Sequence, residues 1–204
     1  VLKSHYEPTA AQAYLVRQIV PDIEIFGGIT MDLANGGVNP VAVEHMTRVL
    51  GRFGRIVWMP TYDAEAVVYA SREGGSSFAR VSRNGMLLST TLAVLATVAK
   101  NDLVLATGHV SSEEGLLLIQ EARKMGVQRI VVTHAMDSGW TIRQMREAAR
   151  AGAFIEFAKP QGRLSIDEYA DGIRKVGPRY CIVSQVGVSH LPPEFVGAFV
   201  VALI

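Results

Sequence analysis

Residues 101–137 read NDLVLATGHVSSEEGLLLIQEARKMGVQRIVVTHAMD, and this stretch decides the fold that the sequence predicts. One apolar run, DLVLAT, leads to His109, and a second, RIVVT, leads to His134. The residues between them have the pattern of a helix, with Ser111 or Ser112 as N-cap, acidic side chains in the first turn and a glycine at the end. The stretch therefore predicts one β-α-β unit.

His109 and His134 occupy equivalent places in this unit, each at the end of a predicted strand. Parallel strands joined by a right-handed crossover point the same way, so both histidines are expected at the carboxyl edge of one sheet. A single histidine at such a place is often bonded to a neighbouring carbonyl and has no chemical role. Two of them favour a functional site, because histidine is the commonest metal ligand and strand ends carry functional residues.

The composition is that of a globular protein, with 204 residues, 49% hydrophobic content and a net charge of +1. Basic and acidic residues are interspersed, which gives no electrostatic case for nucleic acid or for an anionic membrane as partner. No run of about 20 apolar residues and no signal peptide is recognised. The single cysteine, Cys181, lies in an apolar run and excludes an internal disulfide framework, so a cytoplasmic location is expected.

Seven apolar runs are predicted as strands, and each is followed by a helical pattern. They are VLKSHY, DIEIFGG, RIVWMPT, DLVLATGH, RIVVTH, AFIEFA and YCIVSQ. A (β/α)8 barrel of the TIM type has eight such units in about 250 residues, so the sequence predicts a single barrel domain over residues 1–204 that lacks its first β-α unit. A doubly wound open sheet is the competing architecture, but its usual Gly-rich first turn is absent.

Capping signals mark where the helices begin. They are Thr9 with Gln12, Asn39 with Pro40, Thr141 with Gln144, Ser165 with Glu168, and Pro193 at the start of a final helix that runs to Ile204. Residues 61–88 interrupt the alternation and are predicted to be an insertion. Asn84-Gly85 has the composition of a tight hairpin turn, and Gly74 to Ser77 has that of a loop.

Several phrases occur along the sequence that are fairly specific when taken together: VLKSHYEPTA, EIFGGI, NPVAVE, RIVWMPT, LATGHVS and VTHAM. With them the chain resembles an uncharacterised branch of the amidohydrolase superfamily of metal-dependent hydrolases. The resemblance runs from Val1 to about Gly187. It implies a metal centre at the carboxyl mouth of a barrel, built from a His-x-His of strand one, histidines on strands five and six, and an acid on strand eight. His109 and His134 match the histidines of strands five and six.

The sequence departs from this pattern at two of the implied elements. No His-x-His occurs anywhere in the chain, and Gln185 stands where an acid is expected at the end of strand eight. A glutamine can coordinate through its amide oxygen or hold a water, but it cannot act as a carboxylate base. Gln185 is nevertheless a candidate catalytic residue because of its place.

The phrase Lys3-Ser4-His5 also resembles the Thr-Asp-His that phosphoesterases of the polymerase-and-histidinol-phosphatase type carry at this position. Only His5 matches, and it is a candidate metal ligand together with His109 and His134. Lys3 is a candidate catalytic residue. It can be a surface residue at a strand start, a cation for an anionic substrate, or, if carboxylated, a bridge between metals.

Other residues have weaker claims to a role in the site. Asp137 could orient His134 or form a turn, His45 is expected on a helix flank, and His190 follows the last strand. Trp58 and Tyr62 flank a proline at a strand end, where they are expected to pack rather than to line a pocket.

The sequence thus predicts a metal-dependent hydrolase in which a divalent cation, first of all zinc, activates a water for attack on an amide, ester or lactone bond of a small-molecule substrate. Two alternatives remain open, a phosphoesterase and a catalytically inactive barrel that serves for binding. A barrel without its first unit exposes two strand edges, so a homo-oligomer is also predicted.

Overall fold

The computed structural model describes residues 1–71, 77–158, 164–184 and 202–203. The chain divides into two compact units, Val1–Val131 and Val132–Ile204. Four predicted features lie outside the described residues, namely Gln185, His190, the start of the final helix at Pro193 and most of the loop that begins at Gly74.

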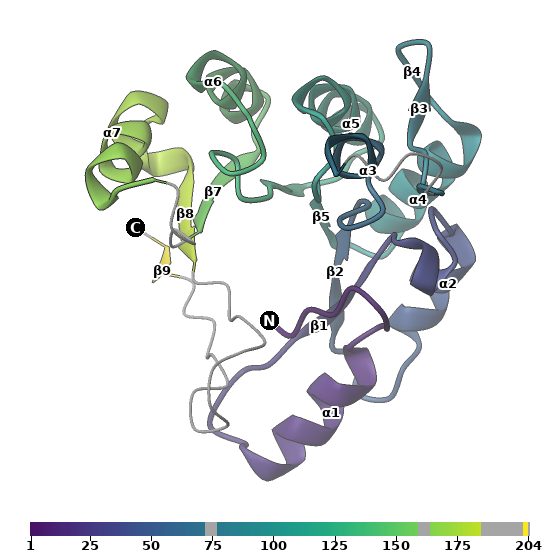
Figure 1. The fold of residues 1–204 in the computed structure, drawn as a ribbon. Coiled ribbons are helices and arrows are strands. Elements are labelled where there is room, and N and C mark those ends of the chain that lie inside the picture. Colours follow the sequence, from purple (N-terminus) through teal and green to yellow (C-terminus); the bar gives the residue numbers. More distant parts are fainter. Residues whose placement is uncertain (72–76, 159–163, 185–201, 204) are drawn as a thin grey trace. The chain divides into compact units, whose positions relative to one another are not determined.

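The first unit is built on parallel strands (Figure 1). In the order in which they pair, they are β1 (Gly27–Thr30), β2 (Gly54–Trp58), β5 (Val104–Ala106) and β6 (Arg129–Val132). Typical partners in the register are Ile29 with Val57, Val57 with Leu105, and Leu105 with Ile130. Each of these strands is followed in the chain by a helix, so the α/β alternation predicted from the sequence is confirmed here.

Capping residues start several helices of the first unit. The unit contains α1 (Ala10–Ile19), the 3-10 helix η1 (Leu33–Asn35), α2 (Pro40–Thr47), α3 (Glu65–Ala70), α4 (Ser89–Lys100) and α5 (Ser112–Lys124). Asn39 accepts hydrogen bonds from the backbone of the first turn of α2, and Ser111 with Glu114 closes a capping box at α5. The predicted cap at α1 is wrong, because Thr9 makes no side-chain cap. Its hydroxyl donates to Leu2 O and accepts from Gly28 N instead.

The first predicted strand, VLKSHY, is not a strand in the structure. Residues 1–5 run parallel to β1, because Leu2 N donates to Phe26 O at 2.8 Å and Thr30 Oγ1 donates to Ser4 O at 3.2 Å. These isolated bonds do not form a regular ladder. They nevertheless bring His5 beside the carboxyl end of β1.

The segment between β2 and α4 contains a short helix and a hairpin. β3 (Ser82–Arg83) and β4 (Met86–Leu87) pair in antiparallel fashion across Asn84 and Gly85. Both turn residues have positive φ, 52° and 73°, which is the geometry of a type I′ turn and explains the Asn-Gly pair. Ser82 Oγ donates to Glu114 Oε1 at 2.7 Å, which anchors this hairpin to α5.

Apolar side chains of the strands and helices form the core of the first unit. The largest of those that are almost fully buried are Ile29, Met31, Met46, Met59, Leu95, Leu105, Leu118, Ile119 and Ile130. Strands buried on both faces read as continuous apolar runs rather than as alternating ones. This explains why LVLA and RIVV indicated strands.

The second unit contains β7 (Phe154–Ala158), β8 (Cys181–Ser184), β9 (Ala202–Leu203), α6 (Ile142–Arg150), α7 (Ile166–Val176) and η2 (Pro178–Tyr180). β7 and β8 are parallel, and both predicted capping boxes are confirmed, at Thr141 and at Ser165. The final helix is wrong at Ala202–Leu203, which pair with β8 as an antiparallel strand. Cys181 is buried, and burial raises the pKa of its thiol to about 11, which fits an inert core residue.

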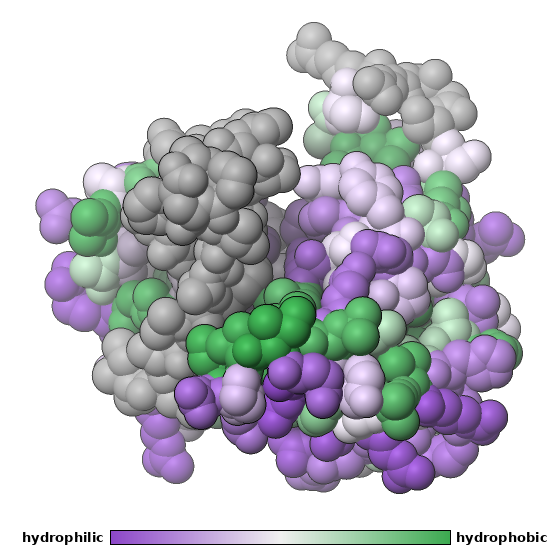
Figure 2. All heavy atoms as spheres, turned by 90° about the horizontal axis from the view of Figure 1, so that it is seen from below, coloured by the Kyte–Doolittle hydropathy of each residue, from purple (hydrophilic) through white to green (hydrophobic). Residues whose placement is uncertain are grey.

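Apolar side chains are also exposed on the first unit. Leu15 and Ile19 on α1, with Ile23 just beyond it, are each more than half exposed. Figure 2 shows apolar residues among polar ones on the face seen from below. No described helix is long and apolar enough to cross a membrane.

Candidate active site

The candidate site of the first unit lies where its strands end. Asp32 follows β1, Thr61 follows β2, and His109 follows β5, while His5 arrives on the segment beside β1. Backbone bonds continue past the strands and fix these ends together: Met31 N donates to Trp58 O and Met59 N to Ala106 O, both at 2.9 Å. Neighbouring parallel strands therefore deliver these residues to one edge, as the sequence predicted for His109.

Three of these side chains form a chain of hydrogen bonds. Nδ1 of His5 lies 2.6 Å from Oγ1 of Thr61, and that hydroxyl donates to Oδ2 of Asp32 in a short hydrogen bond. The direct distance from His5 Nδ1 to Asp32 Oδ2 is 3.7 Å. The imidazole therefore reaches the carboxylate through the threonine hydroxyl.

Asp32 is the buried anchor of this chain, with 1% of its surface exposed. Its Oδ1 accepts from Thr61 N at 2.7 Å and from Asp63 N at 3.1 Å. Burial by itself would raise the pKa of this carboxyl, but the nearby His5 imidazole and the hydrogen bonds from Thr61 and Asp63 outweigh it and lower the pKa to about 2. Asp32 is therefore ionised at neutral pH.

Aromatic rings surround His5. Tyr62 stacks on the imidazole with ring centroids 3.8 Å apart and an angle of 13° between the planes. The ring of His109 lies 6.5 Å from that of His5, and Tyr6 approaches His5 edge-on at 6.4 Å. The structure thus brings together two of the three histidines predicted from sequence. It assigns Tyr62 a place against His5 rather than in the core.

Backbone geometry fixes the position of His109. Gly108 has a φ of +63°, and a Cβ built on it would lie 2.1 Å from Met59 O. Only glycine allows the end of β5 to approach residues 59–60 so closely, and His109 N then donates to Pro60 O at 2.9 Å. On the other side of the site, Asn35 donates to Thr30 O at 3.1 Å and to His5 O at 3.5 Å.

Lys3, the other candidate in the N-terminal segment, places its ammonium 5.4 Å from the centre of the Trp58 ring. This is the distance of a cation–π contact. Trp58 is the last residue of β2 and is buried, so Lys3 lies over the end of that strand.

His134, in the second unit, contacts a different carboxylate from the one the sequence indicated. Its Nδ1 and its backbone N each lie 3.1 Å from Oε2 of Glu156, while Ser184 Oγ donates to Oε1 at 2.7 Å. Asp137, which the sequence left open as a partner of His134 or a turn former, accepts from the hydroxyl of Tyr169 at 2.8 Å. Of the two roles that the sequence left open for Asp137, the structure therefore favours the turn, in which residues 133–139 lie.

Glu156 is partly buried, and its carboxyl remains ionised at neutral pH. Burial raises the pKa of its carboxyl, but the nearby His134 imidazole and the hydrogen bonds from Ser184 and from the backbone of His134 outweigh it and lower the pKa overall. His134 has a φ of +43°, a left-handed conformation that is uncommon outside glycine but in which histidine, like asparagine and aspartate, is enriched. In this conformation the backbone N–H of His134 donates to the side chain of Glu156.

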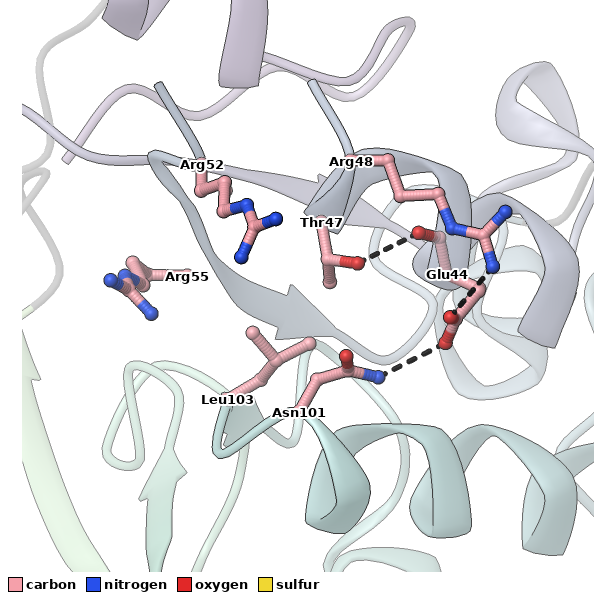
Figure 3. A pocket seen from close by; sticks show the side chains of 8 residues that line it. Glu44, Thr47, Arg48, Arg52, Arg55, Asn101 and Leu103 are labelled. Atoms are coloured by element: carbon pink, nitrogen blue, oxygen red, sulfur yellow. Dashed lines mark hydrogen bonds and ion pairs between the residues drawn. The ribbon is translucent and has the colours of Figure 1, made fainter. Parts of the chain in front are cut away.

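A pocket of about 340 Å³ lies at the opposite edge of the first unit, near the amino ends of β2 and β5. It is lined by Glu44, Thr47, Arg48, Arg52, Gly54, Arg55, Asn101 and Leu103 (Figure 3). Glu44 accepts from Arg48 and Asn101, and the arginines lie close to the carboxyl end of α2, where cations offset the helix dipole. This pocket contains none of the histidines and is not the candidate site.

His45 is exposed on α2, as expected of a residue on the helix flank. The sequence prediction missed Asp32, Thr61 and Glu156. Asp32 had a visible signal, since it follows the apolar run GGITM directly, as His109 follows its own strand. Glu156 lies within β7 and was hidden in the apolar phrase AFIEFA.

Among solved structures, the fold is similar to that of an amidohydrolase from Pseudomonas aeruginosa, with a TM-score of 0.52 and 12% sequence identity. The similarity covers 90% of this chain and 63% of that chain, and it is a similarity of mixed α/β fold with mainly parallel strands. No curated protein gives a significant sequence match. A family model matches residues 1–156, and the chain therefore belongs to a family of unknown function, DUF6282.

Proposed function

We propose that the protein is a hydrolase of the amidohydrolase type that uses an activated water to cleave an amide, ester or lactone bond in a small molecule, within a (β/α)8-type arrangement of strands. One observation carries this proposal: His5 and His109 lie with ring centroids 6.5 Å apart at the carboxyl ends of parallel strands. A fold similar to that of an amidohydrolase supports it. The carboxyl ends of parallel strands are where enzymes of this fold class do their chemistry.

The roles of the residues follow from their contacts. Nδ1 of His5 faces Thr61, so Nε2 is the nitrogen available to accept a proton from water or to bind a ligand. His109 lies beside it and can hold the same substrate or water. Lys3 supplies a cation over Trp58, at the strand end nearest the N-terminal segment, where it can stabilise a developing oxyanion.

The described residues provide only part of a metal site. Two imidazoles that share one zinc at about 2.1 Å place their ring centroids about 5 Å apart at a tetrahedral angle, so His5 and His109 would have to approach each other further. No group of three metal-ligating side chains is found among the described residues. Zinc therefore enters this proposal only as the cation that would lower the pKa of a water if His5 and His109 bound it. His134, which the sequence also predicts as a ligand, belongs to the second unit.

Hydrolysis of simple aryl substrates tests the proposal. The protein should cleave an aryl ester or aryl lactone faster than the uncatalysed reaction, with added zinc, manganese or no metal compared in parallel. His5→Gln and His109→Gln should each lower the rate of hydrolysis at least about 100-fold. His45→Gln, on the flank of α2, should keep the wild-type rate. Cleavage of an aryl phosphate but of no ester would favour the phosphoesterase alternative. Equal rates in all four proteins would contradict the proposal.

A further inference from the structure

The chain of hydrogen bonds from Asp32 to His5 has a direction, and that direction decides which nitrogen of His5 carries the proton. An ionised carboxylate can only accept hydrogen bonds. Oδ1 of Asp32 is taken by two backbone N–H groups, and Oδ2 contacts the hydroxyl of Thr61. The threonine hydrogen must therefore point at Asp32, because two oxygens at that separation would otherwise repel each other.

With its hydrogen given to Asp32, Thr61 offers only lone pairs to His5. The neighbouring Nδ1, at 2.6 Å, must then be the protonated nitrogen. In the neutral imidazole the second nitrogen, Nε2, is left with an unshared electron pair. The burial of Thr61, which is 0% exposed, keeps water from substituting for either partner.

We propose that Asp32 and Thr61 are positioning residues that hold His5 in the Nδ1–H tautomer, so that Nε2 is presented as the basic atom of the site. The role of Nε2 as the basic atom rests on the proposed function, whereas the tautomer itself follows from the contacts. Asp32 and Thr61 touch no substrate in this account, and they act only through His5. Tyr62 supports the same orientation by stacking on the ring.

The most direct variant is Asp32→Asn, which keeps the shape of the side chain. The amide oxygen of the asparagine takes the place of Oδ1, since two backbone N–H groups need an acceptor there. Its NH₂ group then faces Thr61 and donates to the hydroxyl oxygen. Thr61 must turn its own hydrogen toward His5 Nδ1, which forces the proton of His5 onto Nε2. Replacing a buried aspartate by asparagine beside a catalytic histidine has this consequence in serine proteases.

The experiment is nitrogen NMR on protein labelled with ¹⁵N-histidine, at a pH at which the imidazoles are neutral. His5→Gln assigns the signals of His5. The wild type should show Nδ1 protonated and Nε2 unprotonated, and Asp32→Asn should show the reverse. Asp63→Asn is the matched control, because the side chain of Asp63 accepts from Leu33 N at 2.7 Å and is not part of the chain of hydrogen bonds from Asp32 to His5. It should leave the wild-type pattern unchanged.

Two further variants guard against loss of folding. Thr61→Ser retains the hydroxyl and should retain the Nδ1–H tautomer. Thr61→Val removes the hydroxyl, and the preference of His5 for the Nδ1–H tautomer should then be lost. A wild-type His5 with its proton on Nε2, or an Asp32→Asn variant that keeps the wild-type tautomer, would overturn the inference. The readout needs no substrate, so a correct tautomer without aryl ester hydrolysis would reject the proposed function and leave the positioning role standing. If hydrolysis is found, Asp32→Asn should lower its rate about 100-fold or more.

Discussion

Tyr62 stacks on His5 with ring centroids 3.8 Å apart while 52% of its own surface stays exposed. A tyrosine that serves the core is normally covered, so this one contributes mainly to the position of the imidazole. Stacked aromatic pairs are worth about 0.5–1.5 kcal/mol. Tyr62→Leu should therefore lower the unfolding free energy by no more than about 1.5 kcal/mol, while Tyr62→Phe should be close to neutral.

The same variants separate position from stability when aryl ester hydrolysis is measured. Tyr62→Leu should reduce the rate several-fold and Tyr62→Phe should not. Tyr69→Leu, also an exposed tyrosine of the first unit, is the control and should leave the rate unchanged. A loss of equal size in Tyr62→Phe would show that the hydroxyl, not the stacked ring, is what matters.

The buried Asp32 predicts a loss of stability in acid. Its folded pKa of about 2 lies below the value of about 3.9 in an unfolded chain, so its stabilising contribution is present above pH 4 and is lost as the pH falls toward 2. The contribution amounts to roughly 2 kcal/mol. Denaturant unfolding at pH 7, 4, 3 and 2.5 should show Asp32→Asn losing less stability than wild type across this range. Parallel curves for the two proteins would contradict this assignment.

The approach of β5 to the end of β2 gives a prediction about Gly108. Alanine at this position would combine a φ of +63° with a Cβ only 2.1 Å from Met59 O, so Gly108→Ala should cost more than about 2 kcal/mol. Gly126→Ala is the control, because Gly126 has a φ of +88° but no atom within 4 Å of a Cβ. It should cost only about 1–2 kcal/mol. The difference in unfolding free energy between the two variants measures the close contact alone.

Most of the α/β alternation was predictable because it depends on local patterns. The apolar runs that form β2, β5, β6, β7 and β8, and the capping boxes at Ser111, Thr141 and Ser165, are signals within a few residues of one another. The failures have a different origin. Thr9 is a residue type that often caps helices, but its hydroxyl bonds to the backbone of Leu2 and Gly28, which tertiary structure brings close to it.

The candidate site was only partly predictable for the same reason. His5 and His109 were recognisable because histidine at a strand end is distinctive. Asp32 and Thr61 belong to residue types that are common in loops, and only a contact between positions 29 residues apart in sequence shows that they act together. Asp137 was the obvious carboxylate near His134 in the chain, yet Glu156, 22 residues away, is the one that contacts it.

Glu156 should be energetically coupled to Ser184. The hydroxyl donates to the ionised carboxylate at 2.7 Å, and hydrogen bonds to charged groups are worth about 1.5–3 kcal/mol. A double-mutant cycle with Glu156→Gln and Ser184→Ala at pH 7 should therefore give a coupling energy of about 1 kcal/mol or more. The coupling should shrink as the pH falls below the lowered pKa of Glu156, because the carboxyl then becomes neutral. Strictly additive effects at pH 7 would show that the contact contributes nothing.

Metal dependence can be tested without a substrate. If His5 and His109 bind zinc, adding the ion at 100 times its dissociation constant should stabilise the wild type by about 2.7 kcal/mol, and a chelator should reverse the rise in melting temperature. His5→Ala and His109→Ala should each abolish most of this shift while leaving the fold intact, because both residues lie beyond strand ends. His45→Ala, at an exposed position of α2, should keep the full shift. His134→Ala tests the ligand role that the sequence assigns to that residue.

A different result is expected if His5, His109 and His134 are structural residues. Each of the three alanine variants would then lose about 1–3 kcal/mol of unfolding free energy whether or not metal is present, and the wild type would not respond to chelator. That result would remove zinc from the account while leaving the contacts of His5 with Thr61 and Asp32 to be explained by the tautomer alone.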